Sequence, residues 1–228
     1  MMARRSTKRR PRVVGVIASR ADLQRAVRMR RPPDLFELRL DRLAGMADEV
    51  EKVLPRLRTP LIITARDPRE GGANKLRLRQ RRDLLARFLS HADYVDVELR
   101  LASALLPSFG LTKNKKVRRI ISFHDFKSTP SARLLVAKTH NAKALRADIF
   151  KVATRTDTPT ELGRLLEFIT KNRVNVRLTV MGIGRLGDIS RVLLARAGSV
   201  LIYASLGPAT DVEGQLSLEQ LRALDFGP

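Results

Sequence analysis

Apolar runs alternate with helix-patterned segments along most of the chain. Eight mostly apolar runs have the length of buried β-strands: 13–18, 35–40, 61–65, 94–99, 119–123, 149–153, 176–180 and 200–204. Helical patterns lie between them at 22–30, 47–57, 75–90, 131–143, 159–171 and 187–197, with a last one at 218–224. Segment 100–111 has no clear pattern. Eight strand-then-helix units predict an α/β fold, an eight-fold β/α (TIM) barrel, with an open doubly wound sheet as the alternative.

The pattern predicts one catalytic domain over residues 13–228. No linker-like change of composition divides it, and no strong internal repeat is evident. Turn signals at 31–33 and 67–68 fall between the runs, as loops should. Residues 1–12 are basic and lack an apolar core, so we expect a disordered tail.

Segment 36–41 alternates apolar and charged residues. Glu37, Arg39 and Asp41 share one face, and the apolar residues share the other. In a barrel the apolar set would face the helices, so these charged side chains would line the interior and pair there. A half-exposed antiparallel strand is the alternative. Functional groups near the ends of other runs favour the barrel: Arg66, Asp96, Glu98, His124, Lys151 and Met181.

Lys151 lies within the apolar run 149–153. A lysine in an isolated strand is more often directed to solvent. The alternative is a nucleophile, because burial disfavours the charged ammonium and a free amine can attack a carbonyl to form an imine. Ala153 would share the inward face with Lys151 and leave room above the amine.

His124 is the histidine placed at the end of a predicted strand. Imidazole has an ordinary pKa of about 6.5, which suits both acid and base roles, so His124 is a candidate proton carrier beside Lys151. Glu70, in the loop after the third run, could orient that imidazole. A loop glutamate is usually solvated, so its position alone is weak support.

Composition narrows the chemistry. With no cysteine and three histidines, neither disulfides nor thiolate chemistry is available, and we expect no metal. The 228 residues carry a formal net charge of +22, which attracts anions in general. Aromatic residues make up only 4%, too few for base stacking, so specific nucleic-acid binding is not expected. No run is long enough to span a membrane and no signal core follows the first charges, which predicts a cytoplasmic protein.

Five blocks in order resemble the type I 3-dehydroquinate dehydratases, a family of Schiff-base barrel enzymes. The blocks lie at 36–41, 64–66 with 70–72, 122–126, 148–151, and 181–182 with 190–191. The resemblance extends from residue 13 to 224. It implies a lyase that converts 3-dehydroquinate to 3-dehydroshikimate in the shikimate pathway, with no cofactor and as a homodimer.

The resemblance also assigns roles to individual residues. Lys151 would form the imine, His124 would move the proton and Glu70 would hold His124. Substrate contacts would come from Glu37, Arg39, Arg66, Arg191, Gln215, Met181 and Tyr203. Among these, Arg191 matches a carboxylate-binding arginine, Gln215 matches the glutamine of a closing lid, and Tyr203 stands where the family often has phenylalanine.

The lid departs from the family pattern. Residues 211–215 read Asp-Val-Glu-Gly-Gln, where small residues and a proline are common. Two acids near an anionic substrate predict weaker binding, so Glu213→Pro is expected to lower KM. Two other functions remain open: another Schiff-base barrel enzyme, such as a class I aldolase, and a basic nucleic-acid-binding module with a degenerate barrel.

Overall fold

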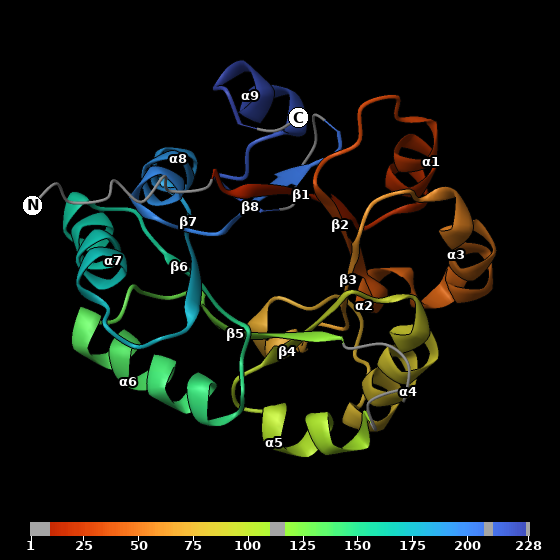
Figure 1. Cartoon of the computed structure of the whole chain (residues 1–228), viewed down its shortest axis with the longest axis horizontal. Helices are drawn as coiled ribbons and strands as arrows, with labels where there is room; N and C mark the ends of the chain where they lie inside the picture. Colours follow the sequence, from red (N-terminus) through yellow and green to blue (C-terminus); the bar gives the residue numbers. More distant parts are fainter. Residues whose placement is uncertain (1–9, 110–116, 208–211, 227–228) are drawn as a thin grey trace, which may run out of the picture.

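The computed structural model describes residues 10–109, 117–207 and 212–226. Eight parallel strands form one sheet in the order β7-β6-β5-β4-β3-β2-β1-β8, curled into a nearly closed barrel (Figure 1). The strands are β1 Arg12–Ile17, β2 Leu35–Arg39, β3 Leu61–Thr64, β4 Tyr94–Glu98, β5 Arg118–Asp125, β6 Ile149–Arg155, β7 Arg177–Ile183 and β8 Leu201–Ser205. The predicted eight-fold β/α barrel is confirmed, and the doubly wound alternative is wrong. The tail predicted at 1–12 lies mostly outside the described residues, and its expected disorder stays a prediction.

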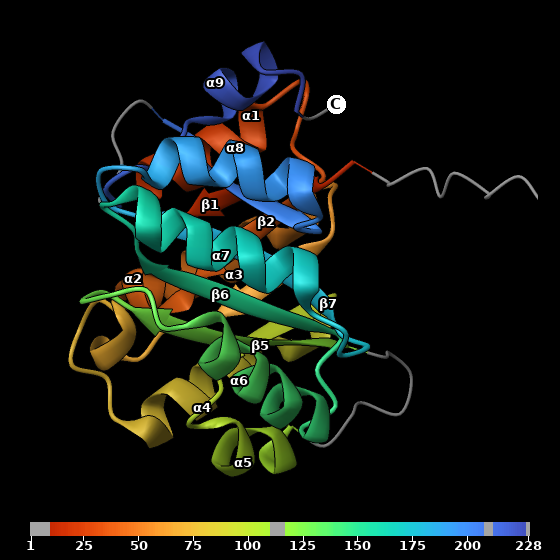
Figure 2. The ribbon, with the colours of Figure 1, turned by 90° about the vertical axis from the view of Figure 1, so that its left-hand side faces the viewer.

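Helices follow the strands and cover the outside of the barrel, with α6, α7 and α8 side by side along one flank (Figure 2). The described helices are α1 Arg20–Arg28, α2 Leu40–Leu43, α3 Ala47–Val53, α4 Leu78–Phe88, α5 Ala102–Leu105, α6 Ala132–Ala144, α7 Pro159–Lys171, α8 Gly187–Ala197 and α9 Leu218–Ala223. Side-chain caps begin several of them. Thr158 accepts the N–H of Glu161 at the start of α7, and Pro159 occupies the first helical position, where no N–H is needed.

The barrel closes between β7 and β8 through a few specific contacts. The N–H of Val200 donates to the carbonyl of Leu178 at 2.8 Å. The hydroxyl of Ser199 accepts the N–H of Val180 at 2.6 Å and donates to the same residue's carbonyl at 3.1 Å. A buried side chain therefore takes over part of the strand pairing at this seam.

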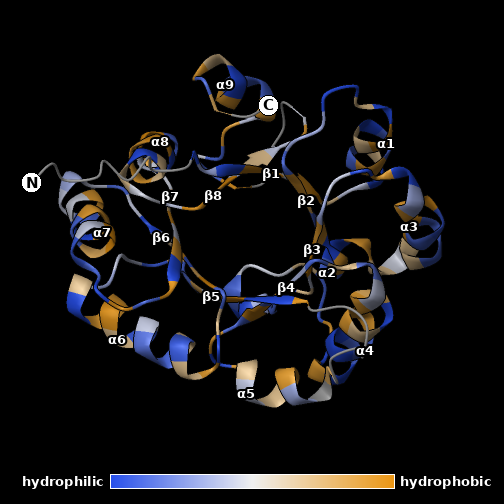
Figure 3. Ribbon diagram, in the orientation of Figure 1, coloured by the Kyte–Doolittle hydropathy of each residue, from blue (hydrophilic) through white to orange (hydrophobic). Residues whose placement is uncertain are grey.

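Two apolar cores lie on the two faces of the sheet. The larger core fills the space between strands and helices, and a smaller one fills the barrel interior. The helices carry both apolar and polar residues around their circumference, as expected for helices that bury one face (Figure 3). Leu35, Tyr94, Ile149 and Leu201, each the first residue of an even-numbered strand, belong to the interior core.

A short repeat absent from the sequence-based prediction underlies these even-numbered strands. Asp34, Asp93 and Asp148 each immediately precede a strand, namely β2, β4 and β6. Each carboxylate accepts the backbone N–H at the start of the preceding odd-numbered strand: Val13 at 2.8 Å, Leu61 at 3.0 Å and Arg119 at 2.8 Å. The repeat is short and its copies lie far apart, so only the shared contacts make it recognisable.

The same repeat sets the level of the functional residues. Three positions after each aspartate stand Glu37, Asp96 and Lys151, and the matching position of β8 holds Tyr203. Because side chains alternate between the two faces of a strand, these four residues point inward and share one level of the barrel. Four alternate strands therefore bring two carboxylates, one amine and one phenol together.

Some element boundaries differ from the predicted ones. β5 continues through His124 to Asp125, and β6 continues to Arg155, because the two strands keep pairing beyond the apolar runs. His124 therefore lies within a strand rather than at its end. β2 ends at Arg39 and α2 begins at once, so Asp41 lies in a helix and not on the inward face of the strand.

Candidate active site

One cavity of about 790 Å³ opens at the carboxyl ends of the strands. All ten residues predicted for the site line it: Glu37, Arg39, Arg66, Glu70, His124, Lys151, Met181, Arg191, Tyr203 and Gln215. The structure therefore brings the whole predicted set together.

Lys151 lies deep in this cavity and is paired with two acids. Its Nζ donates to Asp96 Oδ2 at 3.0 Å and to Glu37 Oε1 at 3.5 Å, and it lies 4.0 Å from the centroid of the Tyr203 ring. The residue is 4% exposed, which rules out the solvent-directed alternative. The two carboxylates and the ring face surround the Nζ atom and hold it inside the barrel.

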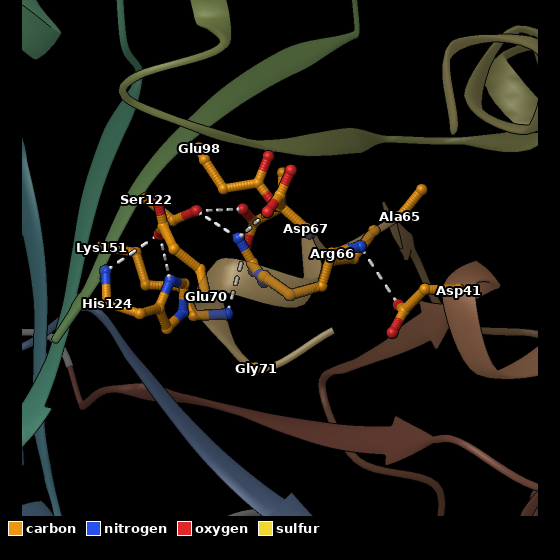
Figure 4. Close-up of polar contacts among 12 residues, drawn as sticks. Asp41, Ala65, Arg66, Asp67, Glu70, Gly71, Glu98, Ser122, His124 and Lys151 are labelled. Atoms are coloured by element: carbon orange, nitrogen blue, oxygen red, sulfur yellow. Dashed lines mark hydrogen bonds and ion pairs between the residues drawn. The ribbon is translucent and has the colours of Figure 1, made fainter. Parts of the chain in front are cut away.

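Arg66 fixes the acid beside the amine. Its guanidinium donates to Asp96 at 2.8 Å, to the Ser122 hydroxyl at 2.5 Å and to Glu98 at 3.4 Å (Figure 4). Burial alone would raise the pKa of Asp96, but Arg66 and Lys151 together hold that pKa well below its usual range. Asp96 therefore stays ionised and is unsuited to take a proton from the amine. The arginine predicted to bind substrate is thus largely occupied by the protein.

His124 and Glu70 form the second pair. The Glu70 Oε2 lies 3.0 Å from His124 Nδ1 and also accepts the His124 backbone N–H at 3.1 Å. When Nδ1 carries the proton and donates to the carboxylate, Nε2 is left as a free base. His124 and Lys151 lie on the adjacent strands β5 and β6. In the register of these strands His124 pairs with Ala153, and Lys151 pairs with Ser122, so the imidazole lies two residues nearer the carboxyl end than the amine.

The protonation of this pair is set by burial and by nearby cations. Burial, with Arg66 and Lys151 adding to it, lowers the pKa of His124 well below its ordinary value, so the imidazole is neutral at pH 7. Burial raises the pKa of Glu70 to about 7, although Arg66 and Arg100 oppose the rise. A neutral imidazole is ready to accept a proton, and an ionised Glu70 would stabilise the imidazolium that forms.

Arg100 and Arg81 complete the network, and neither was predicted from the sequence. Arg100 Nε donates to the second oxygen of Glu70 at 3.2 Å and also pairs with Asp67. Arg81, on α4 and 1% exposed, donates to Asp67 at 2.8 Å and to Glu98 at 2.6 Å. Arg81 lies in a polar, arginine-rich helix, and nothing in the pattern marks it as the member that turns inward.

Gly71 allows the loop to approach the histidine strand. It follows Glu70 with φ of 81°, in the left-handed region that favours glycine, and an added Cβ would lie 2.5 Å from the Phe126 ring. Phe126 in turn stacks on His124, with ring centroids 6.4 Å apart and planes 12° from parallel. The glycine thus lets an aromatic ring cover one side of the imidazole.

Asp41 holds Arg39 at the rim of the cavity. The buried carboxylate accepts two bonds from the Arg39 guanidinium, at 3.0 and 2.9 Å. It also accepts the backbone N–H groups of Arg66 at 3.1 Å and Ala73 at 2.9 Å, and so ties the loop after β3 to the end of β2. The expectation that Asp41 lines the barrel interior is wrong, because Asp41 lies in α2 and its carboxylate binds the backbone of the loop after β3.

Arg191 differs from the other cavity arginines. It is 3% exposed, and no carboxylate within the described parts of the chain pairs with it. Its Nε donates to the carbonyl of Gly214 at 2.9 Å and one terminal nitrogen to the sulfur of Met181 at 3.3 Å. Burial lowers the pKa of Arg191 to about 10, which leaves it charged at neutral pH. A buried and uncompensated guanidinium is suited to receive an anionic group of a ligand.

The lid segment is docked by an ion pair. Arg155 donates to Glu213 at 2.9 Å and to Asp157 at 2.5 Å, and the carbonyl of Glu213 accepts the N–H of Gly184 at 3.1 Å. Arg155 is thus shared between two acids and offsets the charge of Glu213 in part, and the weaker binding expected from the lid acids stays a prediction. Asp211 lies outside the described residues. Gln215 lines the cavity, and its backbone N–H donates to the carbonyl of Val212 at 3.0 Å.

Two negative findings apply to the described residues. Within residues 10–109, 117–207 and 212–226, no group of three or more His, Asp or Glu side chains is placed to hold a metal ion. No helix in these same ranges is long and apolar enough to cross a membrane.

Comparison with known proteins gives a consistent result. The family model for type I 3-dehydroquinase matches residues 14–225. The 3-dehydroquinate dehydratase of Methanocaldococcus jannaschii is 32% identical over 194 residues, covering 84% of this chain and 86% of that protein. That of Shouchella clausii is 30% identical over 205 residues, covering 84% and 80%.

A solved structure agrees with these relatives. The type I 3-dehydroquinate dehydratase of Clostridium difficile superimposes with a TM-score of 0.81 at 25% identity, covering 94% of this chain and 90% of that one. The family model spans nearly the whole barrel, including every residue of the cavity discussed above. The chain belongs to the type I 3-dehydroquinase family.

Proposed function

We propose that this enzyme dehydrates 3-dehydroquinate to 3-dehydroshikimate through an imine on Lys151. One observation carries the proposal: a buried amine, a neutral imidazole and a buried guanidinium without a carboxylate partner among the described residues line the same cavity. These three groups match a substrate that presents a ketone, an acidic C–H bond beside the ketone, and a carboxylate.

The reaction begins at the ketone. The free amine of Lys151 adds to the carbonyl carbon, and loss of water gives the imine, which acts as an electron sink. His124 Nε2 then removes a proton from the carbon next to the imine, and the electron pair moves to nitrogen as an enamine. The enamine returns its electrons as the hydroxyl on the following carbon departs, protonated by the same imidazole. Hydrolysis of the conjugated imine releases product and restores the amine.

Each remaining group has a place in this sequence. Arg191 binds the substrate carboxylate, which a planar fork of donors suits. Glu70 stabilises the imidazolium, and Asp96 with Glu37 keeps the positive iminium nitrogen in a matched field. Arg39, Met181, Tyr203 and Gln215 complete the walls around the substrate hydroxyls. Arg66 chiefly holds Asp96 in position.

Covalent trapping tests the proposal directly. Borohydride added with 3-dehydroquinate reduces the imine and leaves a stable mass increase on the Lys151 peptide, whereas Lys151→Ala stays unlabelled. Release of the conjugated enone, followed by absorbance, reports the reaction itself. An active wild-type enzyme that acquires no label at Lys151 would rule out the imine mechanism.

We also propose, from the family resemblance alone, that two copies form a homodimer and that the enzyme works in the cytoplasm. Sedimentation equilibrium over a range of protein concentrations tests the first part. A single species at the mass of one chain, 25.6 kDa, would contradict it. Subcellular fractionation tests the second part.

A further inference from the structure

The end of the barrel opposite the active site contains two arginines that share one phenol. Arg12 at the start of β1 donates to the Tyr94 hydroxyl at 2.6 Å, and Arg118 at the start of β5 donates to the same oxygen at 2.7 Å. Their guanidinium carbons lie 5.5 and 4.9 Å from the centroid of the Tyr94 ring. We refer to Arg12 and Arg118 as the basal arginine pair.

Strand parity explains why the pair converges. Arg12 and Arg118 stand two residues before Val14 and Ile120, which belong to the interior core, so both begin on the inward face of the barrel. Arg177, at the start of β7, has the same parity, since its register partner Ile149 is also interior. Three of the four odd-numbered strands thus present an arginine toward the barrel axis at its amino end.

The acids at this end do not neutralise these cations. Asp34, Asp93 and Asp148 are the aspartates that accept strand N–H groups. Asp34 additionally pairs with Arg10, at 2.9 Å. Arg177 Nε donates to the backbone carbonyl of Asp148 at 3.2 Å, not to its carboxylate. Among the described residues, neither member of the basal arginine pair forms an ion pair with an acid.

Two guanidiniums that donate to one phenol oxygen repel each other. A ligand with several negatively charged oxygens would remove that repulsion and accept bidentate bonds from both forks. The site is reachable, because Arg118 and Arg177 are exposed and Arg12 is half-buried. We propose that the basal arginine pair, with Arg177 on the same inward face at the start of β7, binds a compact phosphate-type oxyanion on the barrel axis.

Convergence on the axis selects the ligand class. A compact anion with oxygens directed to several sides fits cations that approach from different strands. Arginines spread over a flat surface would instead attract anions without binding one at a defined position. The site is separate from the active site, because the strands are parallel and one end carries the cavity while the other carries the pair. The interior core, including Val14 and Ile120, lies between the two. The inference does not depend on the proposed reaction.

Calorimetric titration with pyrophosphate at constant ionic strength tests the proposal. We expect one pyrophosphate per chain in the wild type, and affinity at least about tenfold lower in Arg118→Gln, because two charge-assisted hydrogen bonds are lost. Arg133→Gln is the matched control, since it removes the same charge from an exposed position on α6. Arg177→Gln provides a second, exposed variant in case Arg118→Gln folds poorly. Dehydratase activity should be unchanged in all three variants.

Tyrosine emission provides an independent readout. The chain has two tyrosines and no tryptophan, so a Tyr203→Phe background leaves Tyr94 as the sole reporter. Pyrophosphate should change its emission with the same saturation as the calorimetric signal. Tighter binding of AMP or ATP than of pyrophosphate would support a nucleotide as the source of the phosphate, and weaker binding would support a free anion.

Three results would overturn the inference. Equal losses in Arg118→Gln and Arg133→Gln would show that only the overall charge matters. Several weak sites per chain would show the same. Binding of a short RNA that depends on Arg118, with no binding of pyrophosphate, would replace the compact site with a nucleic-acid surface.

Discussion

The two ends of the barrel use arginine in different ways. At the carboxyl end most guanidiniums meet carboxylates: Arg66 meets Asp96 and Glu98, and Arg39 meets Asp41. Arg191 differs from these two, because its partners among the described residues are a carbonyl and a thioether. At the amino end the basal arginine pair meets a phenol instead of an acid.

The difference separates cations that build the protein from cations that are available to a ligand. A paired and buried guanidinium contributes to the fold, and its removal leaves acids uncompensated. An unpaired one costs desolvation free energy that an incoming anion can offset. Arg191 at one end and the basal arginine pair at the other are therefore the cations that we propose as anion sites.

The largest effect is expected from removal of the Lys151 amine, which donates to Asp96 and Glu37. Lys151→Ala should lower kcat on the order of 10⁴-fold or more, because the imine cannot form and the residual rate depends on binding groups alone. Steady-state absorbance of the enone measures it. Lys151→Arg is the control, since it keeps the positive charge beside Asp96 and Glu37 and should be equally inactive. Recovery of activity in the arginine variant would mean that charge, not nucleophilicity, is required.

Arg191 and Arg66 should respond oppositely to the same substitution. Arg191→Met should raise KM about 100-fold with a smaller change in kcat, because a bidentate bond to the substrate carboxylate is lost. Its thermal stability should stay equal or rise, since an uncompensated buried charge is removed. Arg66→Met should instead lower the free energy of unfolding by about 3–5 kcal/mol, because Asp96 and Glu98 lose a buried partner.

Chemical denaturation and kinetics on the two variants together decide the comparison. Arg133→Met serves as the neutral reference for loss of one positive charge on the surface. Similar destabilisation of Arg191→Met and Arg66→Met would mean that Arg191 is a structural cation after all. An unchanged KM in Arg191→Met would remove it from the substrate site.

A pH effect is expected from Arg100, whose Nε donates to Glu70 Oε1 at 3.2 Å. Burial raises the pKa of Glu70 to about 7, and Arg100 and Arg66 oppose that rise while Glu98 adds to it. Removing Arg100 should raise the pKa of Glu70 further. Ionised Glu70 supports the His124 imidazolium, so the acidic limb of kcat/KM should move to higher pH in Arg100→Gln.

The direction in which the acidic limb moves distinguishes an effect of Arg100 on the pKa of Glu70 from a purely structural role. Loss of packing alone would lower kcat/KM at every pH without moving the limb. Arg100→Lys keeps a cation in reach of Glu70 and should leave the limb near its wild-type position. A limb that moves to lower pH in Arg100→Gln would contradict the assignment.

The sequence predicted the fold and the residues of the cavity better than the ion pairs that these residues form. Alternation in 36–41 and the apolar run around Lys151 left a solvent-facing alternative open for each, and the pattern of eight units with functional groups near the strand ends favoured the barrel interior for Glu37 and Lys151. Arg81 and Arg100 could not be predicted, because their acidic partners come from other segments. Arg81 also lies among other arginines in α4, and Arg100 begins the segment 100–111, which has no clear pattern. Asp41 was placed wrongly because the alternating pattern continues to residue 41, whereas β2 ends at Arg39 and α2 begins at Leu40.

The smallest expected effect concerns the lid, where the pairing of charges changes a prediction made from sequence. Glu213 was expected to weaken binding of an anion, yet it pairs with Arg155 at 2.9 Å. Exposed pairs of this kind contribute about 0.2–1 kcal/mol. The Arg155–Glu213 pair holds the segment that contains Gly214, the residue whose carbonyl accepts a hydrogen bond from Arg191.

Glu213→Gln should therefore raise KM by roughly twofold at low salt. The same measurement at high salt should show a smaller difference, because screening weakens the pair in the wild type. Glu213→Pro, for which a lower KM was predicted, removes the pair and restricts the backbone at once, and Glu213→Gln separates the two effects. A lower KM in Glu213→Gln would show that the acid repels the substrate despite its partner.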